Sequence, residues 1–445
     1  MTQGQRALVG AIVGEGGVSQ LGAHYIQHLS QTQYSNVTRY DNVNSSFYGF
    51  YNGGLADLQE VININTDEAT RDLAAASGAN NNQIAAAMIM QAWTFISITD
   101  IWGDLPFSQA LKGAEFLMPI YDTQRDIYEG VVANLTAAGD MITGGSIEGD
   151  IIFGGDMDLW RKFANSLILR AGVRVSEADA DLGRTWVRSA VQRGVMTSTA
   201  DIAQFTYLGS GDAANNEYYN DFLTRTDYAI SDVLVDILND RNDPRVEVYA
   251  QPTEASVLAG TPDYVGMPYG LTQAESGAIP IADVSFPGLA FISATSPAVL
   301  MNYAEVLFNQ AEAAARGWLD DDAGALYNAA ITASMNQHGI TDATAISDYL
   351  AQGNVAYDAG NWREMIGTQK WIAQYFQGVE AWADWRRIDF PSLDPAPQPL
   401  ETDQIPRRRG YPTDEANLNA ENYQAAIDRQ FGGADDLDGT VWWDQ

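Results

Sequence analysis

The sequence predicts a mainly α-helical protein with little β-structure. Apolar residues recur at helical spacing along most of the 445-residue chain, whereas segments that alternate like a strand are sparse. Alanines also interleave with bulky residues in consecutive helical segments, which predicts helices that pack in pairs. From these patterns, helices are expected near 5–29, 47–62, 82–101, 123–142, 157–175, 181–193, 228–239, 297–317, 322–337, 344–352, 361–386 and 415–430.

The clearest pair joins 297–317 to 322–337 through a short turn. "YAEVLFNQAEAAARGW" places small Ala304 and Ala311 near large Leu307 and Phe308. Interlock of this kind is typical of tetratricopeptide-type helical hairpins, although the full consensus of that repeat is absent. We therefore expect about four degenerate hairpins with no strict repeat period.

Local signals mark several helix ends and two strands. Thr123 is a suitable N-cap for 123–142, and Pro297 suits the first turn of the helix at 297–317. Gly317 and Gly339 follow the ends of their helices. Strands are predicted at 200–208 and 245–252.

These elements divide the chain into a helical scaffold and a loop-rich, irregular face. Long loops in a compact domain are uncommon unless they bind something or cover a surface. The scaffold is expected at about 5–29, 47–62, 82–101, 123–193, 297–337 and 344–386. The binding face is expected at about 30–48, 103–121, 205–296 and 387–414.

Composition excludes several classes of function. The chain has 58 acidic against 24 basic residues, a net charge of −34, which argues against direct binding to nucleic acid or to an anionic membrane surface. It has no cysteine, so disulfides, thiolate metal sites and cysteine nucleophiles are excluded. The apolar segment 84–102 is long enough to span a membrane, but its polar residues favour a buried core helix.

The segment "FQGVEAWADWRRIDFP" (376–391) places acidic residues beside arginines and tryptophans. On a helix, its carboxylates point along one surface instead of facing each other across a cleft, as glycoside cleavage requires. Neighbouring arginines also keep carboxylates ionised, the wrong state for a general acid. We interpret Glu380, Asp384, Arg386 and Arg387 as a structural ion-pair cluster.

Other charged or ligating residues also favour structural roles, and no metal or other cofactor is expected. His24 and His28 stand at a spacing that two metal ligands could use, but no carboxylate lies close by in the sequence, so packing is the simpler interpretation. "RRR" (407–409) is expected to pair with carboxylates. "DDLDGT" (435–440) is a fragment of a calcium-loop pattern without the terminal glutamate, which leaves Ca²⁺ as an alternative.

Four segments, in order, resemble the SusD/RagB-type nutrient-binding outer-membrane lipoproteins. "AAAMIMQAWTFISITDIWGDLPFSQAL" (85–111) is similar to the early helix of this family and its Gly-Asp-x-Pro turn, and "VLMNYAEVLFNQAEAAARGW" (299–318) to its "AE…AEA" helix. "GVEAWADWRRIDFP" (378–391) resembles the late helix. "IPRRRGYPTDEANLNAENYQAAI" (405–427), with "VWWDQ" (441–445), resembles the ending of the SusD-like branch.

The resemblance covers roughly the whole chain and implies a single SusD-like domain over 1–445. It implies a non-catalytic protein at the cell surface that captures glycan for nutrient uptake and delivers it to a SusC-like TonB-dependent transporter. It also implies a lipid anchor in the outer membrane. The lipid-bearing cysteine and signal peptide of the family are not in this chain, so lipidation is an expectation from the resemblance alone.

A glycan site needs flat aromatic rings for the apolar faces of the sugars, with fixed polar groups for the hydroxyls. Tyrosines and asparagines interleave in 33–52 and 206–222, and further tyrosines occur in 262–270. The simpler interpretation of each ring alone is that it packs its own loop onto the helices. The predicted ligand-binding residues are Tyr40, Asn42, Asn44, Tyr48, Tyr218, Tyr219, Asn220 and Tyr264.

Two alternatives stay open at this point. A helical glycoside hydrolase or lyase needs only two of the many carboxylates. A tetratricopeptide-type scaffold could instead bind a peptide or protein in its helical groove. The sequence names neither the glycan nor the face that would meet a transporter.

Overall fold

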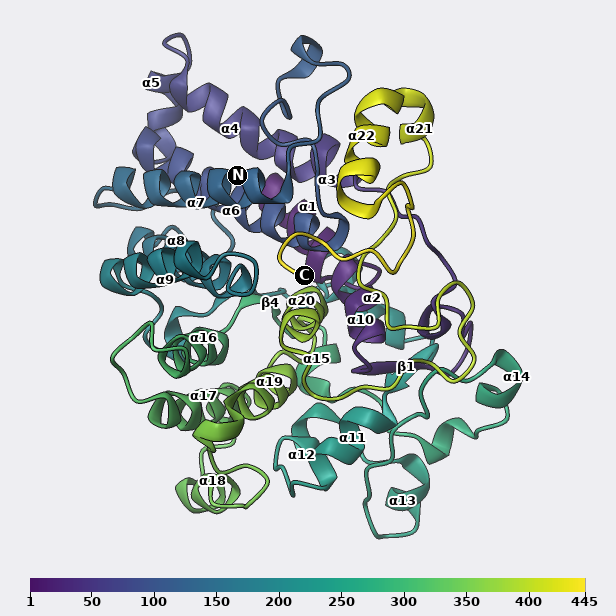
Figure 1. Cartoon of the computed structure of the whole chain (residues 1–445). Coiled ribbons are helices and arrows are strands. Elements are labelled where there is room, and N and C mark those ends of the chain that lie inside the picture. Colours follow the sequence, from purple (N-terminus) through teal and green to yellow (C-terminus); the bar gives the residue numbers. More distant parts are fainter. Residues whose placement is uncertain (445) are drawn as a thin grey trace. The chain divides into compact units, whose positions relative to one another are not determined.

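A computed structural model describes residues 1–444 of the chain and shows a mainly helical fold of the tetratricopeptide-like type (Figure 1). The chain forms two compact units. Unit 1 comprises Met1–Ile12, Val43–Gln204 and Arg407–Gln445, and unit 2 comprises Val13–Asn42 and Phe205–Pro406. The expectation of a single domain stays a prediction.

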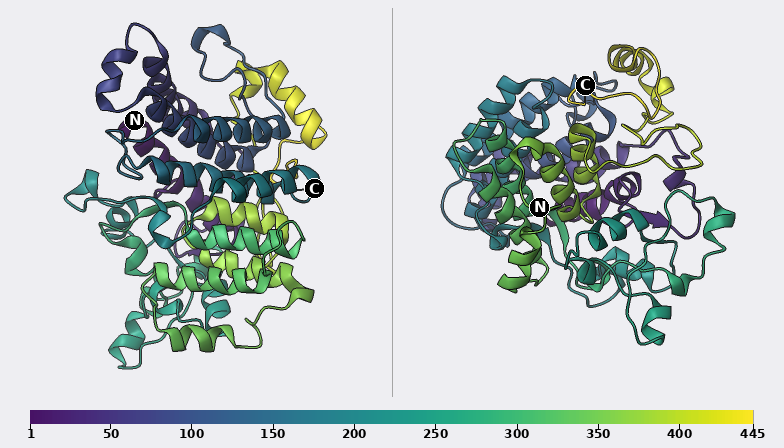
Figure 2. Two further views of the ribbon diagram at one scale, coloured as in Figure 1. Left: turned by 90° about the vertical axis from the view of Figure 1, so that its left-hand side faces the viewer. Right: turned by 60° about the horizontal axis from the view of Figure 1, so that its bottom comes forward.

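Unit 1 is built around long helices that pack in sequence order. α6 packs on α4 and α7, α7 on α8, and α8 on α9, seen as a blue-to-teal stack in the left view of Figure 2. Its elements are α1 (Thr2–Val13), α3 (Tyr48–Phe50), a π-helical segment (Tyr51–Leu55), α4 (Ala56–Thr66), α5 (Arg71–Ala74), α6 (Asn80–Trp102), α7 (Gln124–Met141), α8 (Met157–Arg174), α9 (Ala180–Arg193), β2 (Ala203–Phe205), α21 (Glu415–Leu418) and α22 (Ala420–Phe431).

The core of unit 1 follows from α6. This helix is long and apolar enough to cross a membrane by length and composition, but 83% of its most apolar window is buried inside the protein. It is a core helix, as its polar residues predicted. The predicted cap at Thr123 is also present, since its side chain accepts a hydrogen bond from the backbone of Asp126 at the start of α7.

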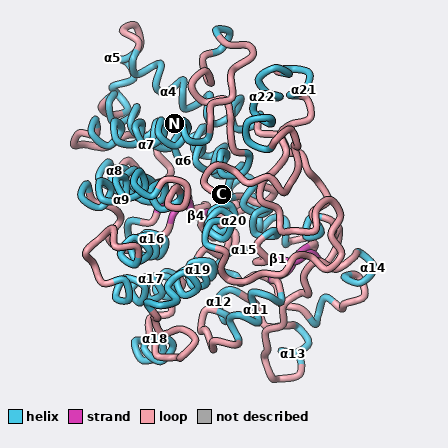
Figure 3. The backbone as a smooth tube through the Cα atoms, viewed as in Figure 1, coloured by secondary structure: helices cyan, strands magenta, loops and turns pink. Residues whose placement is uncertain are grey.

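Unit 2 combines helical hairpins with many short elements joined by loops, the pink segments around α11–α15 in Figure 3. Its first half holds α2 (Val18–Tyr25), β1 (Leu29–Gln31), α10 (Glu217–Phe222), β3 (Tyr228–Ile230), α11 (Asp232–Asn239), α12 (Val246–Tyr249), α13 (Glu254–Leu258), α14 (Gln273–Ser276) and α15 (Leu289–Ile292). Its second half holds β4 (Ala298–Met301), α16 (Tyr303–Ala315), α17 (Ala323–Gln337), α18 (Ala343–Leu350), α19 (Trp362–Ala373) and α20 (Gly378–Ile388).

The predicted hairpin of α16 and α17 is present. Small Ala304 and Ala311 share a buried cluster with Phe308, Tyr327 and Ile331, so small residues of one helix admit large residues of the other. Consecutive helices also pair as α6 with α7, α8 with α9, and α19 with α20. Gly317, directly after α16, adopts a positive φ of 71°, which a glycine reaches at little cost.

Two features hold the site-forming part of unit 2 in place. α2 packs on α20, where a Cβ at Gly378 would lie 2.0 Å from the carbonyl oxygen of Ser19 and one at Gly22 would lie 2.5 Å from that of Gly378. Only glycine allows the two backbones to approach this closely. β1 and β3 pair antiparallel and place Gln31 opposite Tyr228.

Several predicted elements differ from the structure. The expected strand at 245–252 is the helix α12, because the fully buried Arg245 donates to Ser334 and Gln369, long-range contacts that override strand propensity. The helix expected from Pro297 begins only at Tyr303, where the side chain of Asn302 accepts a hydrogen bond from the backbone of Glu305. Residues 298–301 form β4 instead.

Two predicted helices are also interrupted, and a third begins later than expected. The helix at 5–29 breaks between α1 and α2 around Gly16, which has a φ of 70°. The helix at 361–386 breaks at Phe376, which also has a positive φ, between α19 and α20. The helix expected at 228–239 begins only at Asp232, because 228–230 pair as β3 and Ser231 caps the helix.

Candidate functional site

The structure buries one predicted ligand residue of the first loop. Tyr40 is 0% exposed, and its hydroxyl accepts a hydrogen bond from the backbone of Ala396 at 2.9 Å. Its ring packs edge to face against Tyr25. This placement corrects the expectation that the Tyr40 ring is displayed to a ligand, because its apolar and polar groups already have partners inside the protein.

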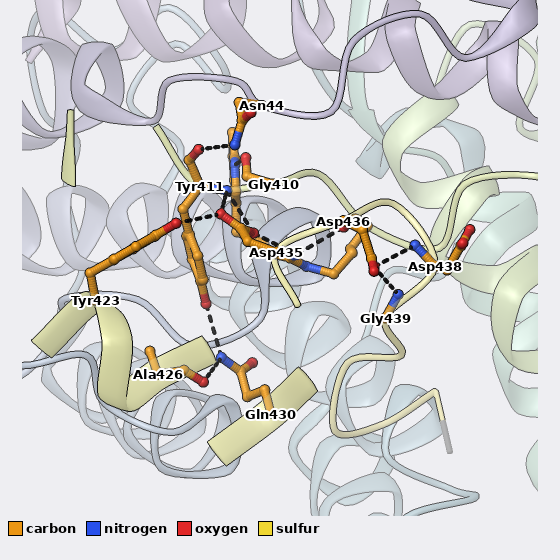
Figure 4. A network of polar contacts seen from close by, with 12 residues as sticks. Asn44, Gly410, Tyr411, Tyr423, Ala426, Gln430, Asp435, Asp436, Asp438 and Gly439 are labelled. Atoms are coloured by element: carbon orange, nitrogen blue, oxygen red, sulfur yellow. Dashed lines mark hydrogen bonds and ion pairs between the residues drawn. The ribbon is translucent and has the colours of Figure 1, made fainter. Parts of the chain in front are cut away.

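The neighbouring residues of that loop separate between the units. Asn42 is exposed in unit 2, whereas Asn44 belongs to unit 1 and donates to the carbonyl oxygen of Tyr411 at 2.7 Å (Figure 4). Tyr48, also in unit 1, donates its hydroxyl to Glu415 at 2.6 Å. Asn44 and Tyr48 thus make contacts that fix their own loops.

The second predicted cluster also contributes to packing. Tyr218 is 4% exposed and lies edge to face on Phe376, which corrects the expectation of a displayed ring. Asn220 donates to the carbonyl oxygen of Asp212 and accepts from Asn215. Tyr219 and Tyr264 are half-buried, and their role in binding stays a prediction.

The acidic and basic residues of α20 lie in a buried ion-pair network. Lys370 lies 2.5 Å from Asp384, and Arg387 contacts Glu312 at 2.5 and 2.7 Å and Asp384 at 3.4 Å. Burial alone would raise the pKa of Glu312, but the guanidinium groups of Arg387 and Arg316 hold it down to about 2.

The other two members of the predicted cluster are buried on the same helix. Arg386 lies 4.0 Å from the ring centroid of Trp382, a cation–π contact. Glu380 is 8% exposed. The charged side chains of α20 are therefore buried and make ion pairs and a cation–π contact inside the protein.

Figure 4 shows what "DDLDGT" does in unit 1. The carboxylate of Asp435 accepts from the backbone nitrogen of Tyr411 at 3.2 Å. It also accepts from the guanidinium of Arg408 at 2.7 Å. Asp436 accepts from the backbone nitrogens of Asp438 and Gly439. Arg408 thus pairs with a carboxylate, as predicted for the "RRR" segment (407–409).

An open cleft of about 490 Å³ lies wholly within unit 2, and we call it the α2–α10 cleft. The loop before α2 and one face of that helix form one wall. The end of α10, the turn after it and the start of β3 form another, and the segment after β1 closes the third side. The cleft is lined by Glu15, Gly16, Gly17, Gln20, Leu21, His24, Gln31, Tyr34, Val37, Asp221, Arg225, Asp227 and Tyr228.

Tyr34 supplies the cleft with an accessible aromatic ring. It is 64% exposed, and its backbone has a positive φ of 52°. The guanidinium carbon of Arg225 lies 5.8 Å from the ring centroid, so the arginine covers part of one side. Much of this ring remains open to a flat apolar ligand surface.

The carboxylates of the cleft differ in how well they are neutralised. Arg225 donates to Asp227 at 2.6 Å through Nε and again through its terminal nitrogen, while Asp221 lies 3.8 Å from Nε. Burial, and next the charge of Asp221, raises the pKa of Glu15. Burial also raises the pKa of Asp221, although Arg225 opposes the shift.

His24 lies on the α2 wall and is 4% exposed. Its Nδ1 lies 2.8 Å from the carbonyl oxygen of Gln20, which can only accept, so Nδ1 carries the proton. Burial lowers the pKa of His24 to about 4, and its Nε2 has no hydrogen-bond partner within residues 1–444. His28, by contrast, is 0% exposed and packs on Trp371 in the core. The two histidines therefore do not form a shared ligand face.

Comparison with known proteins gives the identity of the fold. The sequence profile of the SusD-like family, described as starch-binding and associating with the outer membrane, matches residues 1–412. The chain belongs to the SusD-like family. Its members are non-catalytic, nutrient-binding proteins of the outer membrane, and this assigns the chain to the cell surface without an enzymatic role.

Solved structures of SusD-like proteins match over almost the full length. A chitin-binding protein is 28% identical with a TM-score of 0.79, covering 95% of this chain and 94% of its own. A SusD homologue from Bacteroides fragilis is 25% identical with a TM-score of 0.85, covering 100% and 99%. A SusD homologue from Flavobacterium johnsoniae, 23% identical with a TM-score of 0.83 and coverage of 99% and 98%, has the same fold. No curated protein sequence matches the chain.

Sequence reasoning missed most of the residues that line the cleft of this SusD-like protein. Tyr34 stands in the tyrosine-rich segment 33–52, but nothing in the sequence distinguishes it from Tyr40. Glu15 and Asp221 are more than 200 positions apart in the chain, and only the folding of unit 2 brings them to one cleft. The glycine-rich break "GEGG" (14–17) was an available signal for a loop at Glu15.

Proposed function

We propose that this SusD-like protein captures chitin-type oligosaccharides in the α2–α10 cleft and delivers them to a SusC-like TonB-dependent transporter. The observation that carries the proposal is the open ring of Tyr34 beside carboxylates and amides within one cleft. A pyranose presents an apolar C–H face and a rim of hydroxyls, and it needs both kinds of partner.

The polar groups of the cleft complement such a rim. Gln31 uses its amide oxygen to accept from the backbone of Thr38, so its NH₂ group remains a donor. Glu15 and Asp221 are acceptors for sugar hydroxyls. A sugar stacked on Tyr34 would thus find both donors and acceptors on the surrounding walls.

The choice of chitin rests on relatedness. The 28%-identical relative that covers 95% of this chain is a chitin-binding protein, and fold and length agree throughout. Because ligand specificity is set by side chains in loops, we treat N-acetylglucosamine oligomers as the first ligand to test and other β-linked glucans as the comparison.

The test is calorimetric titration with N-acetylglucosamine oligomers. Tyr34→Ala should weaken binding roughly tenfold or more, because stacking on an aromatic ring contributes about 1–3 kcal/mol in comparable sites. Tyr34→Phe is the matched control and should bind nearly as the wild type, since the ring is kept. If neither substitution alters binding, the glycan binds outside the α2–α10 cleft. Asn42, Tyr219 and Tyr264 would then be the next candidate ligand-binding residues.

Delivery has its own test. Co-expression with a SusC-like transporter from the same genome should yield a complex that purifies together, and failure of every such transporter to do so would contradict delivery while leaving capture intact. Incubation of the protein with chitin should release no new reducing ends, because stacking and hydrogen bonding alone break no glycosidic bond.

A further inference from the structure

The α2–α10 cleft has an excess of negative charge that its own arginine does not remove. Three carboxylates, those of Glu15, Asp221 and Asp227, line it with a single guanidinium, that of Arg225. Arg225 is committed to Asp227 through two hydrogen bonds and is more distant from Asp221, at 3.8 Å. Glu15 forms no ion pair in the described part of the chain.

The protonation behaviour of the cleft is consistent with this excess. Burial and the nearby charge of Asp221 raise the pKa of Glu15, and burial raises that of Asp221. Each shift means that the ionised form lacks enough favourable partners. A cation placed between the two carboxylates would supply the missing partner.

A hydrogen-bond acceptor on the α2 wall adds to the carboxylates. Nδ1 of His24 donates to Gln20, so Nε2 carries a lone pair and has no donor within residues 1–444. His24 lines the cleft, although only 4% of it is exposed. A buried acceptor without a donor is costly, so a ligand that brings N–H groups gains from it.

We propose that the cleft prefers sugars with a free, protonated amine, such as the glucosamine units of partly deacetylated chitin, over N-acetylated or anionic sugars. An ammonium carries three N–H donors and one positive charge, which match Glu15, Asp221 and the acceptor of His24. An N-acetyl group offers one N–H and no charge. A sulfate or uronate would meet repulsion from the same carboxylates.

This inference rests on the proposed function, because it names the ligand class of the same site. It concerns the polar wall, whereas stacking on Tyr34 concerns the apolar face of the sugar. The two contributions are therefore separable by substitution.

The experiment compares glucosamine and N-acetylglucosamine oligomers of equal length by calorimetry at a mildly acidic pH at which the sugar amines are protonated. The wild type should bind the glucosamine oligomer roughly tenfold more tightly, since hydrogen bonds to charged groups are among the stronger ones. Added salt should reduce the preference, because screening weakens the attraction.

Glu15→Gln and Asp221→Asn should each weaken binding of the glucosamine oligomer more than binding of the acetylated oligomer, because only the charged amine loses an ion pair, and so each should reduce the preference. Asp348→Asn is the matched control, because it removes one carboxylate from an exposed position of α18 that does not line the cleft. It should leave the preference for the glucosamine oligomer unchanged. An equal loss of preference in this variant would show that the protein's net charge, and not the cleft, causes the effect, and this would overturn the inference.

The remaining outcomes are distinguishable. Equal affinity of the wild type for both oligomers would overturn the amine preference and leave glycan capture standing. Binding of neither oligomer would overturn both proposals. A preference that persists in both Glu15→Gln and Asp221→Asn would place the amine elsewhere and overturn the assignment to this cleft.

Discussion

The α2–α10 cleft and the buried network of α20 use the same residue types for opposite purposes. In the network, Glu312 faces Arg387 and Arg316, and Asp384 faces Lys370 and Arg387, so each carboxylate has its cation. In the cleft, Glu15 and Asp221 share one arginine that is committed to Asp227. Both regions contain the same types of charged residue. What distinguishes the structural cluster from the binding surface is whether each carboxylate has a cationic partner within the protein.

The pKa values of the two regions differ in direction for the same reason. Burial would raise the pKa of Glu312, yet its arginines bring it down to about 2. Glu15 is less buried, and the charge of Arg225 opposes the effect of burial without cancelling it, so its pKa is raised. A carboxylate whose ionised form lacks partners in an open cleft is available for a cationic or hydrogen-bonding ligand, whereas one already paired in the core is not.

The largest effect is expected from breaking the network. Arg387→Met leaves the buried Glu312 without its bidentate partner and with Arg316 as its remaining ion pair in the described part of the chain, and removing one partner of a buried ion pair typically costs about 3–5 kcal/mol. Urea denaturation should therefore show a marked fall in the unfolding free energy. Glu312→Leu combined with Arg387→Met should recover part of the loss, because the fully buried carboxylate that lost its bidentate partner is removed as well. An unchanged midpoint for Arg387→Met would show that the network contributes little.

A second, smaller effect should separate the two histidines by pH. Burial lowers the pKa of His28 to about 3 and that of His24 to about 4. Because both folded values lie below the ordinary 6.5, the unfolded chain binds more protons in acid. The stability they contribute is present above about pH 6.5 and is lost as the pH falls toward the folded values.

His28→Phe removes one of these two buried titratable imidazoles. A phenyl ring should fit in its place, because His28 already packs against the rings of Trp371 and Tyr375. Between about pH 6.5 and about pH 5, a single such histidine accounts for about 2 kcal/mol of lost stability. The variant should show a correspondingly shallower decline in unfolding free energy, while His24 still contributes. An identical slope in variant and wild type would mean that His28 is not held neutral in the core.

The two regions also differ in how much of their structure could be predicted from the sequence. Helical periodicity located α6 to α9, α16 and α17, because an amphipathic or alanine-rich pattern is a local property. The pairing of Asp384 with Arg387 was also accessible, since their spacing along one helix is fixed. The cleft was not, because the placement of Glu15 beside Asp221 depends on contacts between segments far apart in the chain.

Aromatic residues show the same limit. Tyr34 and Tyr40 stand six positions apart in one loop, yet one is 64% exposed and the other 0%. What separates them is the backbone nitrogen of Ala396, which donates to the Tyr40 hydroxyl and belongs to a segment more than 350 residues later. No local pattern contains that contact, so sequence alone selected the buried ring.

The smallest effect on stability is expected from Arg225→Gln, which tests the cleft as Arg387→Met tests the network. The Arg225 side chain is 52% exposed, and exposed ion pairs contribute little to folding, so the urea midpoint should match that of the wild type within error. The ligand preference should change instead. Without Arg225, Asp227 and Asp221 lose their nearest cation, and the affinity for glucosamine oligomers relative to acetylated ones should rise. A destabilisation comparable to that of Arg387→Met would make the Arg225–Asp227 pair structural and would remove the distinction between the two regions.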